Sequence, residues 1–237
     1  MNDVRAMVWK EVAELLGSRR FLWVFMAAVL GMGVLPALSF ARQGERAIAV
    51  VGVLFLVLYV LFAAVIVVAN TAPDLVLHER VGHTLEYLLT TPLSVRAIFG
   101  AKIAVAAFVG YVASMLSLGV QLVAVAMLSG KGLHWLFLAQ ADGRVIAFGV
   151  TAGLSLYVAV VGTFVALRIG EQRAAYMVTV FSVGLLIVPF IAGWLHLHLT
   201  VNWVSHAALW LGVIAVGLAA LGLRIFQREM LVLYLQE

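Results

Sequence analysis

The residues best suited to chemistry lie in one polar stretch, LHERVGHTLEYLLTTPLS, at residues 77–94. It contains His78, Glu79 and His83, one residue away from the H-E-x-x-H pattern in which two histidines four positions apart bind zinc. A helix turns about 100° per residue, so residues five positions apart point roughly 140° away from each other. His78 and His83 therefore do not share a helix face, and we expect no metal site here.

Other residue patterns that support catalysis are missing from the sequence. The chain has no cysteine, which excludes a thiolate nucleophile and a disulfide framework. The phosphate-binding pattern G-x-x-x-x-G-K-[ST] does not occur, so any ATP that drives this protein must bind to another subunit. We see no nucleophile–base pair, and we expect neither enzyme activity nor a cofactor in this chain.

The composition is that of a protein whose solvent is lipid. Of the 237 residues, 65% are hydrophobic and 11% are charged, and the mean hydropathy is +1.14. A soluble domain is nearer to about half apolar and about a quarter charged. We therefore expect an all-α integral membrane protein, a single transmembrane permease domain over residues 1–237. Six stretches have the roughly 20 apolar residues that a spanning helix needs: 21–41, 47–72, 99–128, 145–167, 177–196 and 205–223.

The basic residues are unevenly divided between the two sides of these predicted spans. Eleven of the 15 lysines and arginines fall on the side that holds both termini and the 73–98 segment. Because cytoplasmic loops carry the excess of Lys and Arg, both termini are expected in the cytoplasm. Residues 1–20 are expected to form an amphipathic interfacial helix on that membrane face. The net charge of +4 thus indicates topology and contact with anionic membrane lipid, with no role in nucleic-acid binding.

The predicted spans contain mild polar residues in place of acidic ones. No Asp or Glu lies in the middle of any of the six, whereas proton- and ion-driven transporters usually keep an ionisable group there. The simplest interpretation of the buried polar residues is hydrogen bonding within the helix packing. Asn70 and Gln121 are the better candidates for lining a transport path. The full set is Asn70, Thr71, Gln121, Thr151 and Thr163.

The segment 73–98 is expected to be a cytoplasmic loop that forms two short helices. Thr84 is placed to cap the helix LEYLLTT, and Glu86 lies near its positive N-terminal end. Pro92 stops this helix, and Ser94 is placed to cap the helix that leads into the third span. An apolar face of the loop must pack either on a partner or on the N-terminus of the chain itself. That face consists of Leu85, Leu88 and Leu89.

The sequence ERVGHTLEYLLTTPLSVRAIFGAK resembles the cytoplasmic loop of ATP-binding-cassette (ABC) permeases of the second type, the ABC-2 family. The family pattern is roughly E-R-x-x-G-T-L-E-x-L-L-x-T-P-[LV]-S, followed by an Ile and a Gly-Ala/Gly-Lys step. His83 stands where the family has a glycine, and Gly82 lies one position earlier. The positions in register are Glu79, Arg80, Thr84, Leu85, Glu86, Leu88, Leu89, Thr91, Pro92, Leu93, Ser94, Ile98 and Lys102.

This resemblance implies a permease subunit, in most members of the family an exporter, in a prokaryotic plasma (inner) membrane. Two permease chains, either two copies or one copy and a related permease, would pair above two ABC ATPase subunits that hold ATP and Mg²⁺. The loop between the second and third spans would act as a coupling helix that enters a cleft on the ATPase. The resemblance places these residues at the coupling contact: Glu79, Arg80, Thr84, Leu85, Glu86, Leu88, Leu89, Thr91 and Pro92.

Three other functions stay open at this point. A self-sufficient secondary transporter or channel would be active without an ATPase, although the missing acidic residues argue against it. A haem-handling permease of the same broad class is suggested by a cluster of outer histidines, and haem absorbance after purification would reveal it. An intramembrane enzyme lacks a visible catalytic set. The substrate class is open among lipids, peptides, drugs, glycans and ions. The outer histidines are His196, His198 and His206.

Overall fold

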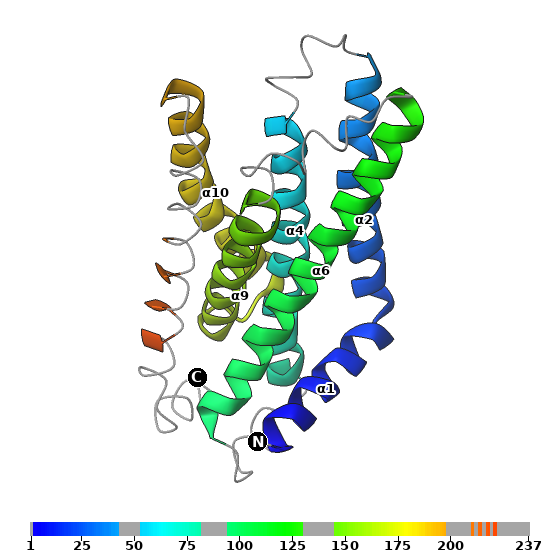
Figure 1. The fold of residues 1–237 in the computed structure, drawn as a ribbon. Coiled ribbons are helices and arrows are strands. Elements are labelled where there is room, and N and C mark those ends of the chain that lie inside the picture. The colour runs from blue at the N-terminus through cyan, green and yellow to red at the C-terminus, as the bar shows by residue number, and fades with distance from the viewer. Residues whose placement is uncertain are drawn as a thin grey trace.

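The computed structural model describes residues 2–42, 53–81, 94–129 and 145–197, with a few helical residues between 210 and 221. Every element in these ranges is a helix (Figure 1), which confirms the expected all-α class for this part of the chain. In chain order the elements are α1 (Asn2–Gly17), α2 (Arg19–Arg42), α4 (Val53–Val81), α6 (Val95–Ser129), the short π-helix η2 (Val145–Val150), α9 (Thr151–Arg168) and α10 (Gln172–Leu197).

Four of the described helices are long and apolar enough to cross a membrane, judged by length and composition. They overlap the first four predicted spans, although the second runs from Leu58 to Glu79 and not over 47–72, and they mark the chain as a membrane protein. The fifth predicted span, 177–196, lies within α10, and the sixth, 205–223, falls largely outside the described residues. The count of six spans therefore stays a prediction. The four apolar stretches are Arg19–Leu38, Leu58–Glu79, Ala97–Leu128 and Phe148–Arg168.

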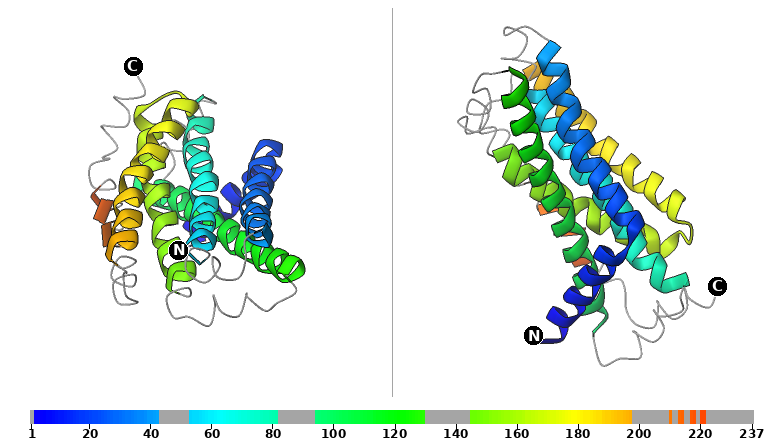
Figure 2. Two further views of the ribbon diagram at one scale, coloured as in Figure 1. Left: turned by 90° about the horizontal axis from the view of Figure 1, so that it is seen from above. Right: turned by 90° about the vertical axis from the view of Figure 1, so that its right-hand side faces the viewer.

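Helix α4 occupies the centre of the bundle. It packs against α2, α6, α9 and α10, and 78% of its apolar stretch is buried, compared with 33% for that of α2. Seen along the bundle, α4 lies between α2 on one side and α9 and α10 on the other (Figure 2). Small side chains let several helices approach it at once. Its fully buried alanines are Ala63, Ala64, Ala69 and Ala72.

Helix α4 continues through Pro73, which corrects the expectation that a polar loop begins at residue 73. Proline removes one backbone hydrogen bond and usually ends a helix in water. Inside a bundle, neighbouring helices and hydroxyl side chains support the interrupted turn. Here Pro73 is buried beside Gly162 of α9, so packing against that helix supports the interrupted turn. His78 and Glu79 consequently lie on the last turns of a long helix.

Helix α1 lies obliquely across the end of the bundle where α4 ends and α6 begins (Figure 1). It ends at Gly17, and Ser18 caps α2 by accepting a hydrogen bond from the backbone N–H of Phe21 at 3.3 Å. Met7 of α1 packs against Ile98 of α6 in a small apolar cluster. One face of α1 is therefore buried against this protein's own bundle.

Helices α4 and α6 touch closely at Gly110. A Cβ atom added there would overlap Val68 Cγ2 of α4 and would lie 3.4 Å from the carbonyl oxygen of Ala64. Glycine at this position thus allows the two backbones to approach, as is common between helices in membranes. This contact sets the spacing of the two helices whose ends carry the site described next.

Candidate functional site

The candidate site is a cluster of buried charges where α1, α4 and α6 meet. Lys102, near the start of α6, is fully buried. Its Nζ atom lies 2.8 Å from Glu11 Oε1, 2.8 Å from Glu79 Oε2 and 2.8 Å from the carbonyl oxygen of Leu75. An ammonium group has three N–H donors, and three oxygens surround it here. Two carboxylates and a carbonyl thus offset the loss of water around this charge.

Glu79 is shared between two lysines from different helices. Its Oε2 atom faces Lys102, and its Oε1 atom accepts a hydrogen bond from Lys10 Nζ at 3.3 Å. Lys10 is partly exposed and also lies 3.4 Å from Glu14 Oε1, one turn further along α1. Helix α1 therefore supplies a cation to Glu79 and an anion, Glu11, to Lys102. These crossed pairs tie α1 to α4 and to α6 at the same point.

Burial dominates the electrostatics of Glu11. The pKa of Glu11 is raised above its ordinary value of 4.5, because burial disfavours the carboxylate by more than Lys102 favours it. For Lys10, burial acts to lower the pKa, but the nearby carboxylates of Glu79, Glu14 and Glu11 outweigh it, and the pKa is raised above 10.5. Pairing with Lys102 thus offsets only part of the desolvation of Glu11, as is usual for buried ion pairs.

A second polar network lies at the same end of the bundle. Arg20 Nη1 donates to Gln172 Oε1 at 2.7 Å, and Gln172 Nε2 donates to Asp74 Oδ1 at 2.9 Å. The amide of Gln172, the first residue of α10, therefore bridges a cation of α2 and an anion of α4. This bridge is exposed on the arginine side, whereas the cluster around Lys102 is closed to solvent.

A small pocket of about 100 Å³ separates the two networks. It lies between the α1–α2 corner and the last turns of α4, and half of the residues that line it are acidic. Its volume leaves room for a few water molecules or for a side chain to move. The residues that line it are Glu11, Glu14, Leu15, Ser18, Asp74, Leu75, His78 and Glu79.

The structure places two ends of the motif at 79–102 side by side. Glu79, expected at the coupling contact, is buried and pairs with Lys102 and Lys10 of the same chain. Arg80 belongs to the last turn of α4. Ser94 caps α6 as predicted, because its Oγ atom accepts a hydrogen bond from the N–H of Ala97 at 3.2 Å. The other predicted coupling residues, Thr84, Leu85, Glu86, Leu88, Leu89, Thr91 and Pro92, lie outside the described ranges.

The two candidates for a transport path are both placed in the bundle. Asn70 is half-buried, and its Nδ2 atom donates to the carbonyl oxygen of Ile66 at 2.7 Å. Gln121 is fully buried. Thr71 and Thr163 likewise bond to carbonyl oxygens of their own helices, so these three bonds lie within single helices and do not join neighbouring ones. Path lining by Asn70 and Gln121 stays a prediction.

The sequence interpretation did not identify Lys10 and Glu11 as site residues. One signal was present, since Lys102 interrupts the apolar run FGAKIAVAAF and a charge within a span requires a partner. The partner itself was not readable, because Glu11 lies 91 positions away in the chain. Only the crossing of α1 over α6 brings the two side chains together.

Within the described ranges, no group of three or more His, Asp or Glu side chains could hold a metal ion. His83, His198 and His206 lie outside those ranges, and His196 is in α10. No protein-family model and no curated protein matches the chain. The site itself must therefore supply the argument for function.

Proposed function

We propose that this chain is the membrane-spanning permease subunit of an ABC transporter, most consistent with an exporter, and that the segment between α4 and α6 couples it to a separate ATPase. The observation that supports this most directly is the ion pair between Glu79 and Lys102 at 2.8 Å. Glu79 and Lys102 are the first and last residues of the motif that resembles the ABC-2 loop. A force on the segment between them would therefore pass into two helices that span the bundle together.

The contacts of α1 support the same proposal. A coupling loop transmits motion only if the helices that flank it move as a unit, and Lys10 and Glu11 join α1 to the end of α4 and the start of α6. Gly110 packs α4 and α6 closely higher in the bundle. The two helices are thus joined at their ends by charge and above by backbone contact.

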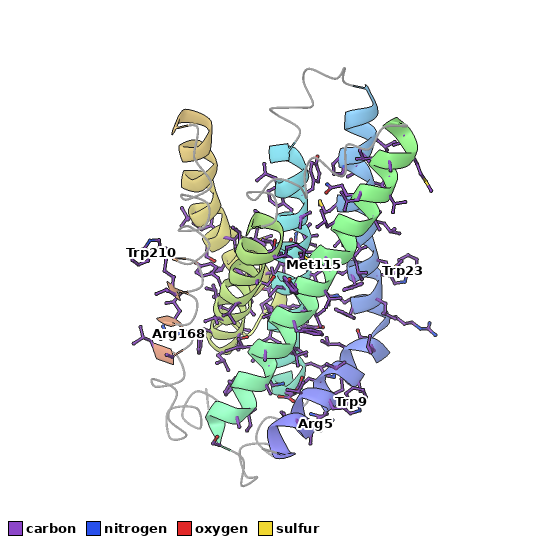
Figure 3. The ribbon with its side chains drawn as sticks, viewed as in Figure 1. Arg5, Trp9, Trp23, Met115, Arg168 and Trp210 are labelled. Carbon is purple, nitrogen blue, oxygen red and sulfur yellow. The ribbon has the colours of Figure 1, made fainter. Side chains whose placement is uncertain are left out.

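Exposed aromatic side chains support an interfacial position for α1. Trp9 and Arg5 lie together on α1, and Trp23 projects away from the bundle further along, on α2 (Figure 3). Trp9 and Trp23 are largely exposed. Tryptophan and arginine are the side chains that settle at the headgroup level of a cytoplasmic leaflet. We place this end of the bundle, with both termini, at the cytoplasmic face of a prokaryotic plasma membrane.

The assembly proposed here has two permease chains and two ATPase subunits, with ATP and Mg²⁺ held by the ATPase. The chain has no phosphate-binding loop, and this requires a partner for ATP use. Glu86, Leu85, Leu88 and Leu89 would contact the ATPase, while Glu79 would hold the base of the coupling segment.

A proton-coupled secondary transporter is the second candidate, and a specific observation favours it. Glu11 and Glu79 are buried carboxylates at the end of the bundle, and the pKa of Glu11 is raised. Ionisable groups in such positions often relay protons. The Lys102 ammonium is surrounded by oxygens, however, as expected for a structural tie. Transport by the purified chain in vesicles, driven by a pH gradient without ATPase, would select this candidate.

The coupling proposal is tested by co-purification with the ABC ATPase encoded beside this chain. Glu86→Ala removes a charge-assisted contact, which is typically worth about 1.5–3 kcal/mol, and should weaken ATPase retention by roughly tenfold or more. Leu89→Asp places a charge in an apolar contact and should abolish retention.

The matched control is His78→Ala, since His78 is exposed at the end of α4 and we assign it no metal. It should leave retention and ATP hydrolysis unchanged. If the first two variants retain the ATPase and hydrolyse ATP normally while His78→Ala is inactive, the coupling proposal is wrong.

A further inference from the structure

We infer that the charge cluster is a release latch, in which Glu79 can leave Lys102 while Glu11 keeps the buried ammonium neutralised. The sharing of Lys102 by two carboxylates involves only residues of this chain and does not depend on any partner. Only the final step rests on the proposed function, namely that movement of the 82–93 segment pulls Glu79 away. The two steps are therefore tested by separate measurements.

The first support for a latch is the excess of carboxylates over buried cations. Lys102 has a partner on α1, Glu11, and a partner on α4, Glu79, each at 2.8 Å. A buried ammonium that loses its sole partner is strongly disfavoured. With two partners, the loss of one leaves an ion pair in place. The arrangement thus permits a movement that a simple pair would prevent.

The second support is that Glu79 lies near the end of its helix, whereas Glu11 lies in the middle of its own. Glu79 lies two residues before α4 ends at Val81, next to the proposed coupling segment. Glu11 lies in the middle of α1, with Met7 and Leu15 buried on either side of it. A pull on the end of α4 therefore acts on Glu79 first, and Glu11 stays with α1.

The third support is that Glu79 has a second cation and free space beside it. Lys10 Nζ is 3.3 Å from Glu79 Oε1, and 43% of the Lys10 side chain is exposed. The pocket of about 100 Å³ also borders Glu79. A carboxylate that leaves Lys102 can therefore remain paired with Lys10 as it moves toward solvent. We assign Glu79 as the exchangeable partner and Glu11 as the resident partner of Lys102.

Redundant pairing is tested by thermal unfolding of the purified chain in detergent. Glu11→Gln and Glu79→Gln each leave Lys102 one carboxylate, and each should lower Tm by at most about 3 °C. The double variant strands the buried ammonium and should lower Tm by about 10 °C or more, well beyond the sum of the two. Adding Lys102→Met to the double variant removes the stranded charge and should recover most of that loss. Additive effects of the two glutamines, or no recovery with Lys102→Met, would overturn the latch.

Exchangeability is tested by distances between spin labels, since a chain without cysteine accepts labels only where cysteines are introduced. One label pair joins His78 of α4 to Ala104 of α6, and the other joins Trp9 of α1 to Ala104; all three sites are exposed. With Glu79→Gln, the α4–α6 distance distribution should broaden and the α1–α6 distribution should not. With Glu11→Gln, the α1–α6 distribution should broaden instead. If either variant broadens both distributions equally, or neither, the cluster is a static clamp and the inference is wrong.

The last step uses the whole complex. Trapping the ATPase in its ATP-bound state should shift the α4–α6 distribution of the otherwise unmodified chain toward that of Glu79→Gln. An unchanged distribution in a complex that hydrolyses ATP would refute the pulling step. If no ATPase binds at all, the proposed function fails, while the unfolding and label results on the chain alone still decide whether Lys102 is shared.

Discussion

The base of the bundle and its middle hold their polar side chains in opposite ways. At the base, Lys102 bonds to Glu11 on another helix, and Lys10 bonds to Glu79 across 69 positions of sequence. In the middle, four hydroxyls bond to a carbonyl oxygen four residues earlier in their own helices. These internal bonds are made by Thr71, Ser114, Thr163 and Thr179. Among the described residues, helices are thus tied by charge at the base and packed by shape in the middle.

This difference shows where the bundle is held in register and where it can adjust. An ion pair at 2.8 Å fixes two helices at one point, and a buried charge makes its loss expensive. A hydroxyl that bonds to its own helix leaves the facing helix without a directional partner, so small shifts there change only van der Waals contacts. A permease that transmits motion from one end needs both properties, in this order along the bundle.

The largest loss of stability is expected from Lys102→Ala, which tests whether buried charge holds the base of the bundle together. It leaves the buried carboxylates of Glu11 and Glu79 without their central cation, and we expect a loss of about 3–5 kcal/mol in the free energy of unfolding. Lys10→Ala is the matched control, since it removes a partly exposed lysine from the same cluster and should cost about 1 kcal/mol or less. Unfolding in detergent with increasing SDS measures both. Equal effects would mean that the base is held by its surface charges.

The middle of the bundle is probed by Gly110→Ala. The new Cβ overlaps Val68 Cγ2, and a β-branched neighbour has little freedom to move aside. We expect a loss of about 1–3 kcal/mol, the usual effect of overpacking. Gly119→Ala is the control on the same helix, because a Cβ there meets nothing within 4 Å. Its effect should lie within about 0.5 kcal/mol, and a Gly110→Ala variant as stable as this control would contradict close packing at that point.

The smallest expected effect is a pH dependence of Tm that reports on Glu11. Its folded-state pKa is raised, so its contribution to stability is fully present below about pH 4.5 and is lost as the pH rises through the folded pKa. Lys102, Glu79 and Lys10 face it from α6, α4 and its own helix. The Tm of the wild type should therefore fall over that window relative to Glu11→Gln. Glu14→Gln, which alters a half-exposed carboxylate on α1, should keep the wild-type slope; a flat difference for Glu11→Gln would contradict the raised pKa.

The sequence predicted the helices well where one face or both faces are apolar, because the length of an apolar run is itself the signal. It was wrong at residue 73, where the apolar run ends but the helix does not. In the bundle, Pro73 packs beside Gly162 of α9, and the helix continues to Val81. The cap at Ser94 was predictable, since it depends on residues within one turn.

Composition and the lengths of the apolar runs predicted that the described part of this chain is helical and that its helices are apolar enough for a membrane, and the family resemblance placed Glu79 and Lys102 at the two ends of one motif. The tertiary structure alone decided that these two residues face each other, that Glu11 joins them, and that Lys10 is the second partner of Glu79. The physical reason is that a buried charge needs an opposite charge within about 4 Å. Which side chain lies that close depends on how α1 crosses α4 and α6, and no local pattern encodes that crossing.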